Sequence, residues 1–219
     1  ENNGILKLGV IGYGRIANRF IVESKYVSGV NVEGVYGPNP DSLRKFADKH
    51  ELAFFETDQD KFLDRVDAVY IASPHLTHYE YIKSALNKGK HVLCEKPMVL
   101  SAIEAKEVYD LAMDKKLVLL EAIKTAYAPG FIRLVSVAKS GLIGQIKNVD
   151  ATFTKLVDGN IRELQAHTAG GSMTELATYP LLAIIKLLGT NFDNIDYYSF
   201  MDEEKNIDLF TKINLTYDK

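Results

Sequence analysis

The chain has 219 residues, 47% hydrophobic and 25% charged, which is ordinary for a globular protein and allows one large or two small domains. The formal net charge is −3 and no basic run is present, which argues against a nucleic-acid partner. The single cysteine, Cys94, excludes an intrachain disulfide and favours a cytoplasmic location, and no apolar run reaches membrane-spanning length.

The first predicted elements are a short apolar strand, a glycine-rich turn and a helix. Residues 8–11, LGVI, predict a buried parallel strand, and residues 12–17, GYGRIA, follow the pattern G-x-G-x-x-A. The apolar face of the helix that follows is expected to contain Ile16, Ala17, Phe20 and Ile21. This order is typical of the opening of a dinucleotide-binding unit, and an ordinary strand–helix turn is the alternative.

Each small residue of this turn has a predicted task. Gly12 allows the tight turn, Gly14 lets the backbone approach a pyrophosphate, and Ala17 lets the helix pack on the strand. Free N–H groups at the helix start, where Arg15 and Ile16 stand, favour an anion.

Strands and helices then alternate as far as about residue 123. Strands are predicted at residues 30–36, 52–55, 67–73, 91–94 and 117–123. Helices are predicted to start at residues 39–41 and at the capping box of residues 101–104, and to cover residues 77–88. This alternation predicts an α/β fold with a doubly wound parallel sheet.

The pattern changes in the second half of the chain. We expect a helix at 129–140, a strand at 146–156, a polar loop at 158–171, a helix bent at Pro180 within 173–188, and an alternating strand at 207–217. One side of the last strand is apolar, which predicts a half-buried strand of an antiparallel sheet. These elements predict an α+β domain that we expect to be truncated, because the last strand needs neighbours.

A short polar motif follows the predicted strand at residues 91–94. Glu95-Lys96-Pro97 lies at the carboxyl end of that strand, where ligands bind in open α/β sheets. A lysine held there could hydrogen-bond a substrate hydroxyl or carry its proton. A surface lysine in a turn before a helix is the alternative.

Five motifs in this order resemble the Gfo/Idh/MocA oxidoreductases, named for glucose–fructose oxidoreductase and inositol dehydrogenase. They are residues 12–17 (GYGRIA), 73–78 (SPHLTH), 95–97 (EKP), 140–146 (SGLIGQI) and 170–179 (GGSMTELATY). The resemblance implies an NAD(P)-binding Rossmann domain at residues 1–123 and a substrate and oligomerisation domain with an open antiparallel sheet at residues 124–219. It also implies a homo-oligomer formed through that sheet, and a sugar, polyol or dihydrodiol-like substrate.

The resemblance also assigns residues to the nicotinamide end of the cofactor. Ser73, Pro74 and His78 would line the cofactor near its ribose, and Glu95 and Lys96 would face that ribose and the reacting carbon. For His78 the alternative is a residue at a helix start that only contacts the backbone. No cysteine or acidic residue accompanies the histidines of this segment, so no metal site is expected.

Glu175 and Tyr179 are four residues apart on a predicted helix and therefore share one face. Many relatives carry Asp and His in these places, and Tyr in the second resembles the glucose–fructose oxidoreductase and dihydrodiol dehydrogenase branch. An ordinary phenol has a pKa near 10 and needs a neighbouring cation to act as a base, which Lys96 could supply. We therefore expect Lys96 and Tyr179 to be catalytic, to project from two domains into one cleft, and to work with Glu175. For Tyr179 a core position is the alternative.

Other polar residues are weaker candidates for contact with the substrate. Lys124 and Tyr127 follow the sixth predicted strand, although Lys124 could equally form an interdomain ion pair. Arg162 and His167 are candidates for covering the site, against the alternative of a solvated loop.

The choice between NAD and NADP stays open at this point. The carboxylate that binds the ribose 2′-OH of NAD is expected at the tip of the second strand, but residues 35–39, VYGPN, contain none. Arg15 or Arg44 could reach a 2′-phosphate, or both could be solvated. We lean toward NADP, because Gly37 leaves room and carries no negative charge.

The motifs together predict an NAD(P)-dependent enzyme that moves hydride between a nicotinamide and a carbinol or carbonyl carbon. One alternative is a non-catalytic cofactor-binding regulator, against which the presence of Lys96 and Tyr179 argues. Another is a glycosidase on the same scaffold that oxidises its substrate transiently with tightly held NAD.

Overall fold

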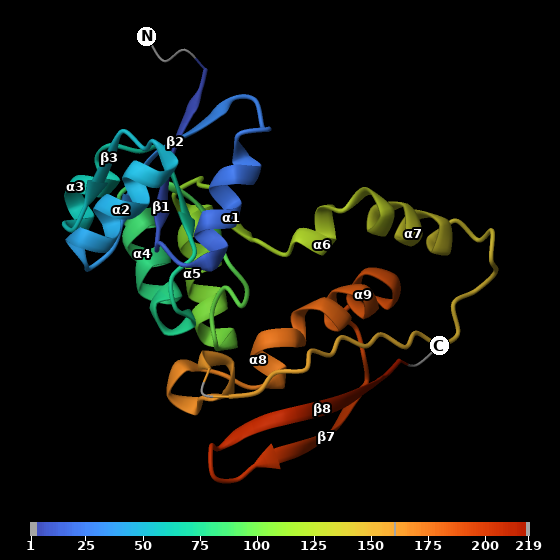
Figure 1. The fold of residues 1–219 in the computed structure, drawn as a ribbon. Helices are drawn as coiled ribbons and strands as arrows, with labels where there is room; N and C mark the ends of the chain where they lie inside the picture. Colours follow the sequence, from blue (N-terminus) through green and yellow to red (C-terminus); the bar gives the residue numbers. More distant parts are fainter. Residues whose placement is uncertain (1–3, 160, 218–219) are drawn as a thin grey trace. The chain divides into compact units, whose positions relative to one another are not determined.

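Residues 4–159 and 161–217 are described by a computed structural model (Figure 1). Contacts divide the chain into two units, Glu1–Ala122 and Ile123–Lys219. In the described part of the chain, no helix has the length and apolar character that crossing a bilayer requires.

The first unit contains a six-stranded sheet in the order β3-β2-β1-β4-β5-β6, with every neighbouring pair parallel. Its strands are β1 (Leu6–Ile11), β2 (Val30–Tyr36), β3 (Phe54–Glu56), β4 (Ala68–Ile71), β5 (His91–Cys94) and β6 (Leu119–Glu121). From β1 the chain adds β2 and β3 on one side. It then crosses to the other side of β1 and adds β4, β5 and β6 there. The predicted doubly wound parallel sheet is confirmed, and its switch point lies between β1 and β4, where such sheets bind ligands.

Helices cover both faces of this sheet (Figure 1). They are α1 (Arg15–Ser24), α2 (Pro40–His50), α3 (Gln59–Leu63), α4 (His78–Asn87) after the 3-10 turn η1 (His75–Thr77), and α5 (Ala102–Asp114).

Successive residues of β1 point to opposite faces of the sheet, so Val10 and Ile11 enter different cores. Val10 packs with residues of α1 and α2, whereas Ile11 packs with residues of α3, α4 and α5.

Short polar signals determine where two of these helices begin. The Asn39 side chain accepts a hydrogen bond from the Ser42 N–H at 2.9 Å, and Pro40 occupies the first turn, where its missing N–H costs nothing. Ser101 accepts from the Glu104 N–H at 3.1 Å, and the Glu104 carboxylate accepts from the Leu100 N–H at 3.2 Å. Ser101 and Glu104 form the predicted capping box. In a standard box the acidic side chain accepts from the N–H of the cap residue, whereas here it accepts from the N–H of the residue before it, Leu100.

Two expectations for the first unit were wrong in detail. The strand predicted at residues 52–55 occupies Phe54–Glu56, because Leu52 instead bonds the carbonyl of Ala47 at the end of α2. Ile16 is 40% exposed, although the amphipathic pattern placed it on the buried face. The buried stripe of α1 is centred on Ala17 and Ile21, which are four residues apart, and Ile16 lies at its edge.

The second unit combines helices with an antiparallel hairpin. Its elements are α6 (Lys124–Tyr127), α7 (Pro129–Lys139), the 3-10 turns η2 (Arg162–Leu164) and η3 (Ala166–Thr168), α8 (Ser172–Leu176), α9 (Thr178–Leu188), β7 (Asn194–Asp202) and β8 (Ile207–Thr216). β7 and β8 pair antiparallel along their length and form the small antiparallel sheet.

Three expectations for this unit need correction. Residues 146–156 form no strand in the structure, and β8 pairs instead with β7, which the sequence analysis missed. The predicted helix break falls at Ala177, and Pro180 lies in the first turn of α9, where proline is tolerated. The pairing register of β7 and β8 shifts at Leu209 of β8. Leu209 is 43% exposed, although the alternating pattern placed it on the apolar side of this strand.

Candidate functional site

The turn after β1 has the geometry that its glycines predict. Gly12 has a φ of 101° and donates from its N–H to the carbonyl of Tyr36 at the end of β2, at 3.0 Å. A Cβ at this position would lie 2.7 Å from the carbonyl oxygen of Ala72, after β4. Only glycine satisfies both constraints, so Gly12 lets the ends of β1, β2 and β4 approach one another.

Gly14 precedes α1 and leaves the start of that helix open. A Cβ built on Gly14 meets no atom within 4 Å, and no side chain caps the helix. The first-turn N–H groups of α1, including those of Arg15 and Ile16, therefore face an accessible space with the positive end of the helix dipole. Ala17 is fully buried behind this turn. This cradle fits a pyrophosphate group.

Asn18 holds the glycine turn in place and was missed in the sequence analysis. Its side-chain amide donates to the Gly14 carbonyl at 2.9 Å, and its Oδ1 accepts from Lys49 Nζ and His50 Nε2, both at 2.8 Å. Burial lowers the pKa of His50, and the nearby charge of Lys49 lowers it further. No local pattern could reveal this contact, because Asn18 and His50 are 32 residues apart.

Ser73 and Pro74 follow β4 and form the second loop at this edge of the sheet. Ser73 Oγ lies 2.7 Å from Thr77 Oγ1, and the Thr77 hydroxyl donates to the Pro74 carbonyl at 2.7 Å. The loop is therefore held in shape by its own side chains before α4 begins.

His78 ties this loop to the Glu95-Lys96-Pro97 loop. Its ring is fully buried, with Nε2 2.9 Å from the Ser73 carbonyl oxygen and Nδ1 2.9 Å from the Pro97 carbonyl oxygen. Both ring nitrogens are occupied by the backbone. The place of His78 along the cofactor ribose stays a prediction beside these backbone contacts.

Glu95 is oriented by a buried tyrosine. Tyr70 donates to Glu95 Oε1 at 2.6 Å, and its ring stacks on Phe20 at 3.7 Å between centroids. Burial raises the pKa of Tyr70, and the negative charge of Glu95 raises it further, so the phenol remains a donor. The Glu95 N–H also donates to the Ile71 carbonyl at 2.9 Å, which joins the ends of β5 and β4. Tyr70 carried no sequence signal, because its strand is uniformly apolar.

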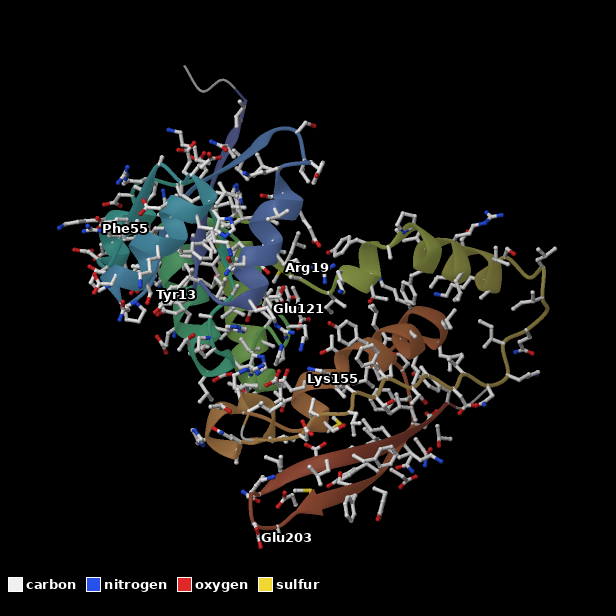
Figure 2. All side chains as sticks on the ribbon, in the orientation of Figure 1. Tyr13, Arg19, Phe55, Glu121, Lys155 and Glu203 are labelled. Atoms are coloured by element: carbon white, nitrogen blue, oxygen red, sulfur yellow. The ribbon has the colours of Figure 1, made fainter. Side chains whose placement is uncertain are left out.

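Lys96 is partly buried within this loop, and the chain beyond it is held by Glu121. The Met98 N–H donates to Glu121 Oε1 at 2.9 Å, and Glu121 and Tyr13 both lie at the lower end of the first unit, where α1 begins (Figure 2). A cavity of about 360 Å³ lies beside the segment after Pro97. Its lining includes Met98, Val99, Leu100, Tyr109 and Glu121. No residue predicted for the site lines this cavity within the described structure.

Gly37 follows β2 but does not leave the room that we expected. A Cβ at this position would lie 2.6 Å from Tyr13 Cε1, so the Tyr13 ring already fills this space. Arg15 and Arg44 are both exposed, and the Arg44 guanidinium lies 5.8 Å from the centre of the Phe55 ring.

The remaining candidates lie in the second unit. Glu175 in α8 has a side chain that is 12% exposed, and Arg162 Nη1 lies 2.9 Å from its Oε1, so this ion pair joins the preceding loop to the helix. Tyr179 in α9 stacks at a tilt on Phe153, 4.7 Å between centroids. Lys124, Tyr127 and His167 are exposed.

Asp208 of β8 caps α8 from another element. Its Oδ2 accepts from the Met173 N–H and from Thr211 Oγ1, both at 2.8 Å. A Cβ on Gly171 would collide with the same carboxylate. Gly171 therefore lets a strand supply the cap that the helix lacks, and this cap sets the start of the helix that carries Glu175.

The structure thus brings the turns after β1, β2, β4 and β5 together at one edge of the first unit's sheet. Glu175 and Tyr179 were expected on one face of a single helix, but the helix is interrupted at Ala177 and they stand on α8 and α9. Across the described residues, no group of three His, Cys, Asp or Glu side chains is arranged to hold a metal ion.

Residues 6–122 match the Gfo/Idh/MocA family, described as "Oxidoreductase family, NAD-binding Rossmann fold". The chain is 29% identical over 199 residues to scyllo-inositol 2-dehydrogenase (NADP(+)) of Bacillus subtilis strain 168, covering 86% of this chain and 60% of that protein. It is 30% identical over 188 residues to trans-1,2-dihydrobenzene-1,2-diol dehydrogenase of Sus scrofa, covering 84% and 56%. The chain therefore spans less than two thirds of these relatives.

A solved structure supports the same relationship. The crystal structure of a 3-ketoreductase from Actinomadura kijaniata, in complex with NADP and TDP-benzene, is similar with a TM-score of 0.87 and 25% identity. The match covers 97% of this chain and 66% of that one.

Proposed function

The chain belongs to the Gfo/Idh/MocA oxidoreductase family with an NAD-binding Rossmann fold, and on this premise we propose that it is an NAD(P)-dependent dehydrogenase or reductase acting on CH–OH groups. The observation that carries the proposal is the open, uncapped start of α1 behind Gly14, at the switch point of the sheet. The substrate is a sugar, polyol or dihydrodiol-like molecule, as the names of the two dehydrogenase relatives suggest.

The cofactor is held by the loops at the carboxyl edge of the sheet. The N–H groups that follow Gly14 bind the pyrophosphate, and Ser73, Pro74 and Glu95 lie along the rest of the dinucleotide. The His78 ring lies between the carbonyls of two of these loops, to one of which the neutral ring donates. When bound, the nicotinamide supplies the hydride chemistry.

Proton transfer at the substrate hydroxyl is assigned to Lys96 and Tyr179. The phenol accepts or returns the hydroxyl proton, and the ammonium stabilises the phenolate form. Glu175 orients the substrate or Tyr179, and Lys124 and Tyr127 contact the substrate. Lys96, Glu175 and Tyr179 are supported by their places in two of the motifs that resemble the family, with Tyr179 as in the glucose–fructose oxidoreductase and dihydrodiol dehydrogenase branch. Lys124 and Tyr127 are supported only by their position after the sixth predicted strand.

Further parts of the proposal concern organisation. Residues 1–123 serve as the cofactor domain and residues 124–219 as the substrate and oligomerisation domain. NADP is the preferred cofactor, the protein is cytoplasmic, and copies of it associate through the C-terminal sheet. The exposed aromatic residues of β7 and β8 support self-association there.

Two measurements on the purified chain test the proposal. Calorimetry with NADP and NAD measures binding, and absorbance at 340 nm across sugars, polyols and dihydrodiols measures turnover. We expect binding of at least one cofactor and reduction with at least one substrate class. Binding without turnover would instead favour the regulator, and retained cofactor without net reduction would favour the glycosidase.

A further inference from the structure

The peptide unit between Gly14 and Arg15 carries one acceptor and one donor of the glycine turn. Because the unit is planar and trans, the Gly14 carbonyl and the Arg15 N–H point in opposite directions and rotate together. A contact that fixes the direction of this carbonyl therefore also fixes the direction of the N–H. The Arg15 N–H is one of the first-turn donors of α1 that face the accessible space beside Gly14.

Asn18 holds the Gly14 carbonyl with two hydrogen bonds. Its backbone N–H donates to the Gly14 carbonyl oxygen at 3.1 Å, and its side-chain Nδ2 donates to the same oxygen at 2.9 Å. The same amide nitrogen lies 3.5 Å from the carbonyl oxygen of Tyr13, in the preceding peptide unit. One residue therefore occupies both acceptor positions of the Gly14 carbonyl.

The last turn of α2 decides which end of the Asn18 amide faces the glycine turn. Lys49 Nζ lies 2.8 Å from Asn18 Oδ1, and an ammonium group only donates, so the atom that it meets must be the amide oxygen. The buried ring of His50 contacts the same oxygen through Nε2, also at 2.8 Å. Since the oxygen is engaged by α2, the amide presents its NH₂ group to the Gly14 carbonyl.

The glycine turn needs such a constraint because packing does not supply one. Gly14 has no Cβ, and a Cβ built there meets no atom within 4 Å. If the peptide unit rotated, its carbonyl oxygen would replace its N–H in the space expected for the cofactor diphosphate, and this oxygen would repel an anion. The hydrogen bonds from Asn18 therefore perform the orientation that neighbouring side chains perform in a packed turn.

We propose that Asn18 is a positioning residue, whose side-chain amide fixes the Gly14–Arg15 peptide unit with its N–H directed at the cofactor diphosphate. The inference rests on the proposed cofactor-dependent function. Asn18 acts through this backbone donor, and Lys49 and His50 act one step further away by holding the amide. The donor is then ordered before the cofactor arrives, which increases affinity.

A purely structural role for Asn18 is the competing explanation. The same side chain joins α1 to α2, and this connection alone could stabilise the unit without directing a backbone donor. Two neutral substitutions separate the two roles. Asn18→Ser is too short to reach α2 but retains a hydroxyl, which in a helix donates to the carbonyl four residues earlier, here that of Gly14. Asn18→Ala loses both contacts.

The test compares these variants with wild type by calorimetry with ADP, NAD and NADP. We expect Asn18→Ala to raise the Kd for all three ligands by a similar factor of about three to ten, because one hydrogen bond is lost and the diphosphate is common to them. Asn18→Ser should regain most of that affinity. Asn18→Asp keeps an acceptor for α2 but has no donor for Gly14, and should bind at least as weakly as Asn18→Ala.

Nuclear magnetic resonance of the cofactor-free protein observes the peptide unit directly. We expect a sharp Arg15 amide signal in wild type and exchange broadening of that signal in Asn18→Ala, measured by relaxation dispersion, because the unit then samples a second orientation. Asn18→Ser should restore the sharp signal. Asn31→Ala removes an exposed asparagine of β2 and is the control, which should change neither this signal nor any Kd.

Four results would each overturn the inference while leaving the proposed function intact. They are wild-type affinities in Asn18→Ala, equally weak binding in Asn18→Ser and Asn18→Ala, wild-type affinities in Asn18→Asp, and an unchanged Arg15 signal in Asn18→Ala. A wild-type protein that binds none of ADP, NAD and NADP would instead contradict the proposed function, and the inference with it.

Discussion

Two glycines of one turn are required for different reasons at the scale of the single residue. Gly12 is confined by the carbonyl of Ala72 and by its φ of 101°, so it serves the fold. Gly14 has a common backbone conformation and open space around it, so the fold does not require glycine there, and its predicted task is to leave room for a ligand. Two glycines of one motif therefore differ: Gly12 is required by the fold, and Gly14 is predicted to be required by a ligand.

Gly14→Val should abolish dinucleotide binding and leave the protein folded. The added side chain enters the space that the pyrophosphate requires, but it meets no protein atom near its Cβ. Calorimetry with NADP and NAD, together with circular dichroism, measures both effects. Gly12→Ala is the matched control and should lower the thermal midpoint. An unchanged cofactor affinity in Gly14→Val would show that the cofactor lies elsewhere.

Lys96→Ala and Tyr179→Phe should each lower kcat by on the order of 10²–10⁴-fold, because each removes one part of the proton-transfer pair. If the two residues act as a unit, the double variant should be little worse than the poorer single variant. Cofactor affinity should change much less in Tyr179→Phe than kcat does. Steady-state kinetics on the substrate found by the absorbance screen provide the measurement, with the exposed Tyr26→Phe as control. Near-normal turnover in Tyr179→Phe would remove this tyrosine from the chemistry.

At the scale of elements, the candidate site is organised by contacts between the ends of strands and helices. Asn18 joins α1 to the last turn of α2, His78 joins the loops after β4 and β5, and Asp208 joins β8 to α8. The contacts of His78 and Asp208 involve backbone groups of a loop or a helix end, whereas the contact of Asn18 with His50 joins two side chains. Mutations here should act first on stability.

The burial of His50 makes stability depend on pH. Because burial lowers the pKa of His50, the unfolded chain binds a proton at a higher pH than the folded protein does. The free energy of unfolding should therefore fall as the pH drops below about 6.5, the ordinary pKa of histidine. Urea titrations between about pH 5 and 8 measure this slope, and His50→Gln should reduce it relative to wild type. The same slope in both proteins would assign it to other groups.

Asp208→Ala should lower the free energy of unfolding by about 0.5–2 kcal/mol, the usual effect of losing a helix N-cap. The reason is that the Met173 N–H and the Thr211 hydroxyl both lose their acceptor. Asp208→Asn retains an acceptor oxygen and should be affected less. Chemical denaturation followed by circular dichroism compares the two. Equal losses in both variants would mean that the charge, and not the cap, is what stabilises the protein.

At the scale of the whole molecule, the two units are stabilised in different ways. The first unit has two buried clusters, one on each face of its sheet. The hairpin of the second unit exposes several large apolar residues, with Phe200 at 57% and its cross-strand partner Phe210 at 45%. Exposed aromatic pairs on a two-stranded sheet are typical of a surface that another chain covers.

If copies of the chain associate through this sheet, Phe200→Glu should weaken the association. A charge placed in an apolar interface costs desolvation without a partner. Sedimentation velocity over a range of protein concentrations measures the mass, and Tyr26→Glu in the first unit is the control. A wild-type protein that stays monomeric at all concentrations would contradict the proposed oligomer.

Short-range sequence patterns determined much of this protein. The G-x-G-x-x-A turn, the capping box at Ser101 and the alternation of strands and helices over residues 8–123 were all readable, because they arise from neighbours within a few turns or one strand. The parallel sheet and the family followed from them and are confirmed. The roles of Lys96 and Tyr179 remain predictions.

Only the tertiary structure decided which distant residues share space. It showed that Tyr13 fills the room beside Gly37, that His78 is buried between two carbonyls, and that Asp208 caps α8. It also paired β8 with β7 and left residues 146–156 without a strand partner. A periodic pattern reports the preference of one segment, whereas packing volume and hydrogen-bond partners depend on segments that meet only after the chain has folded.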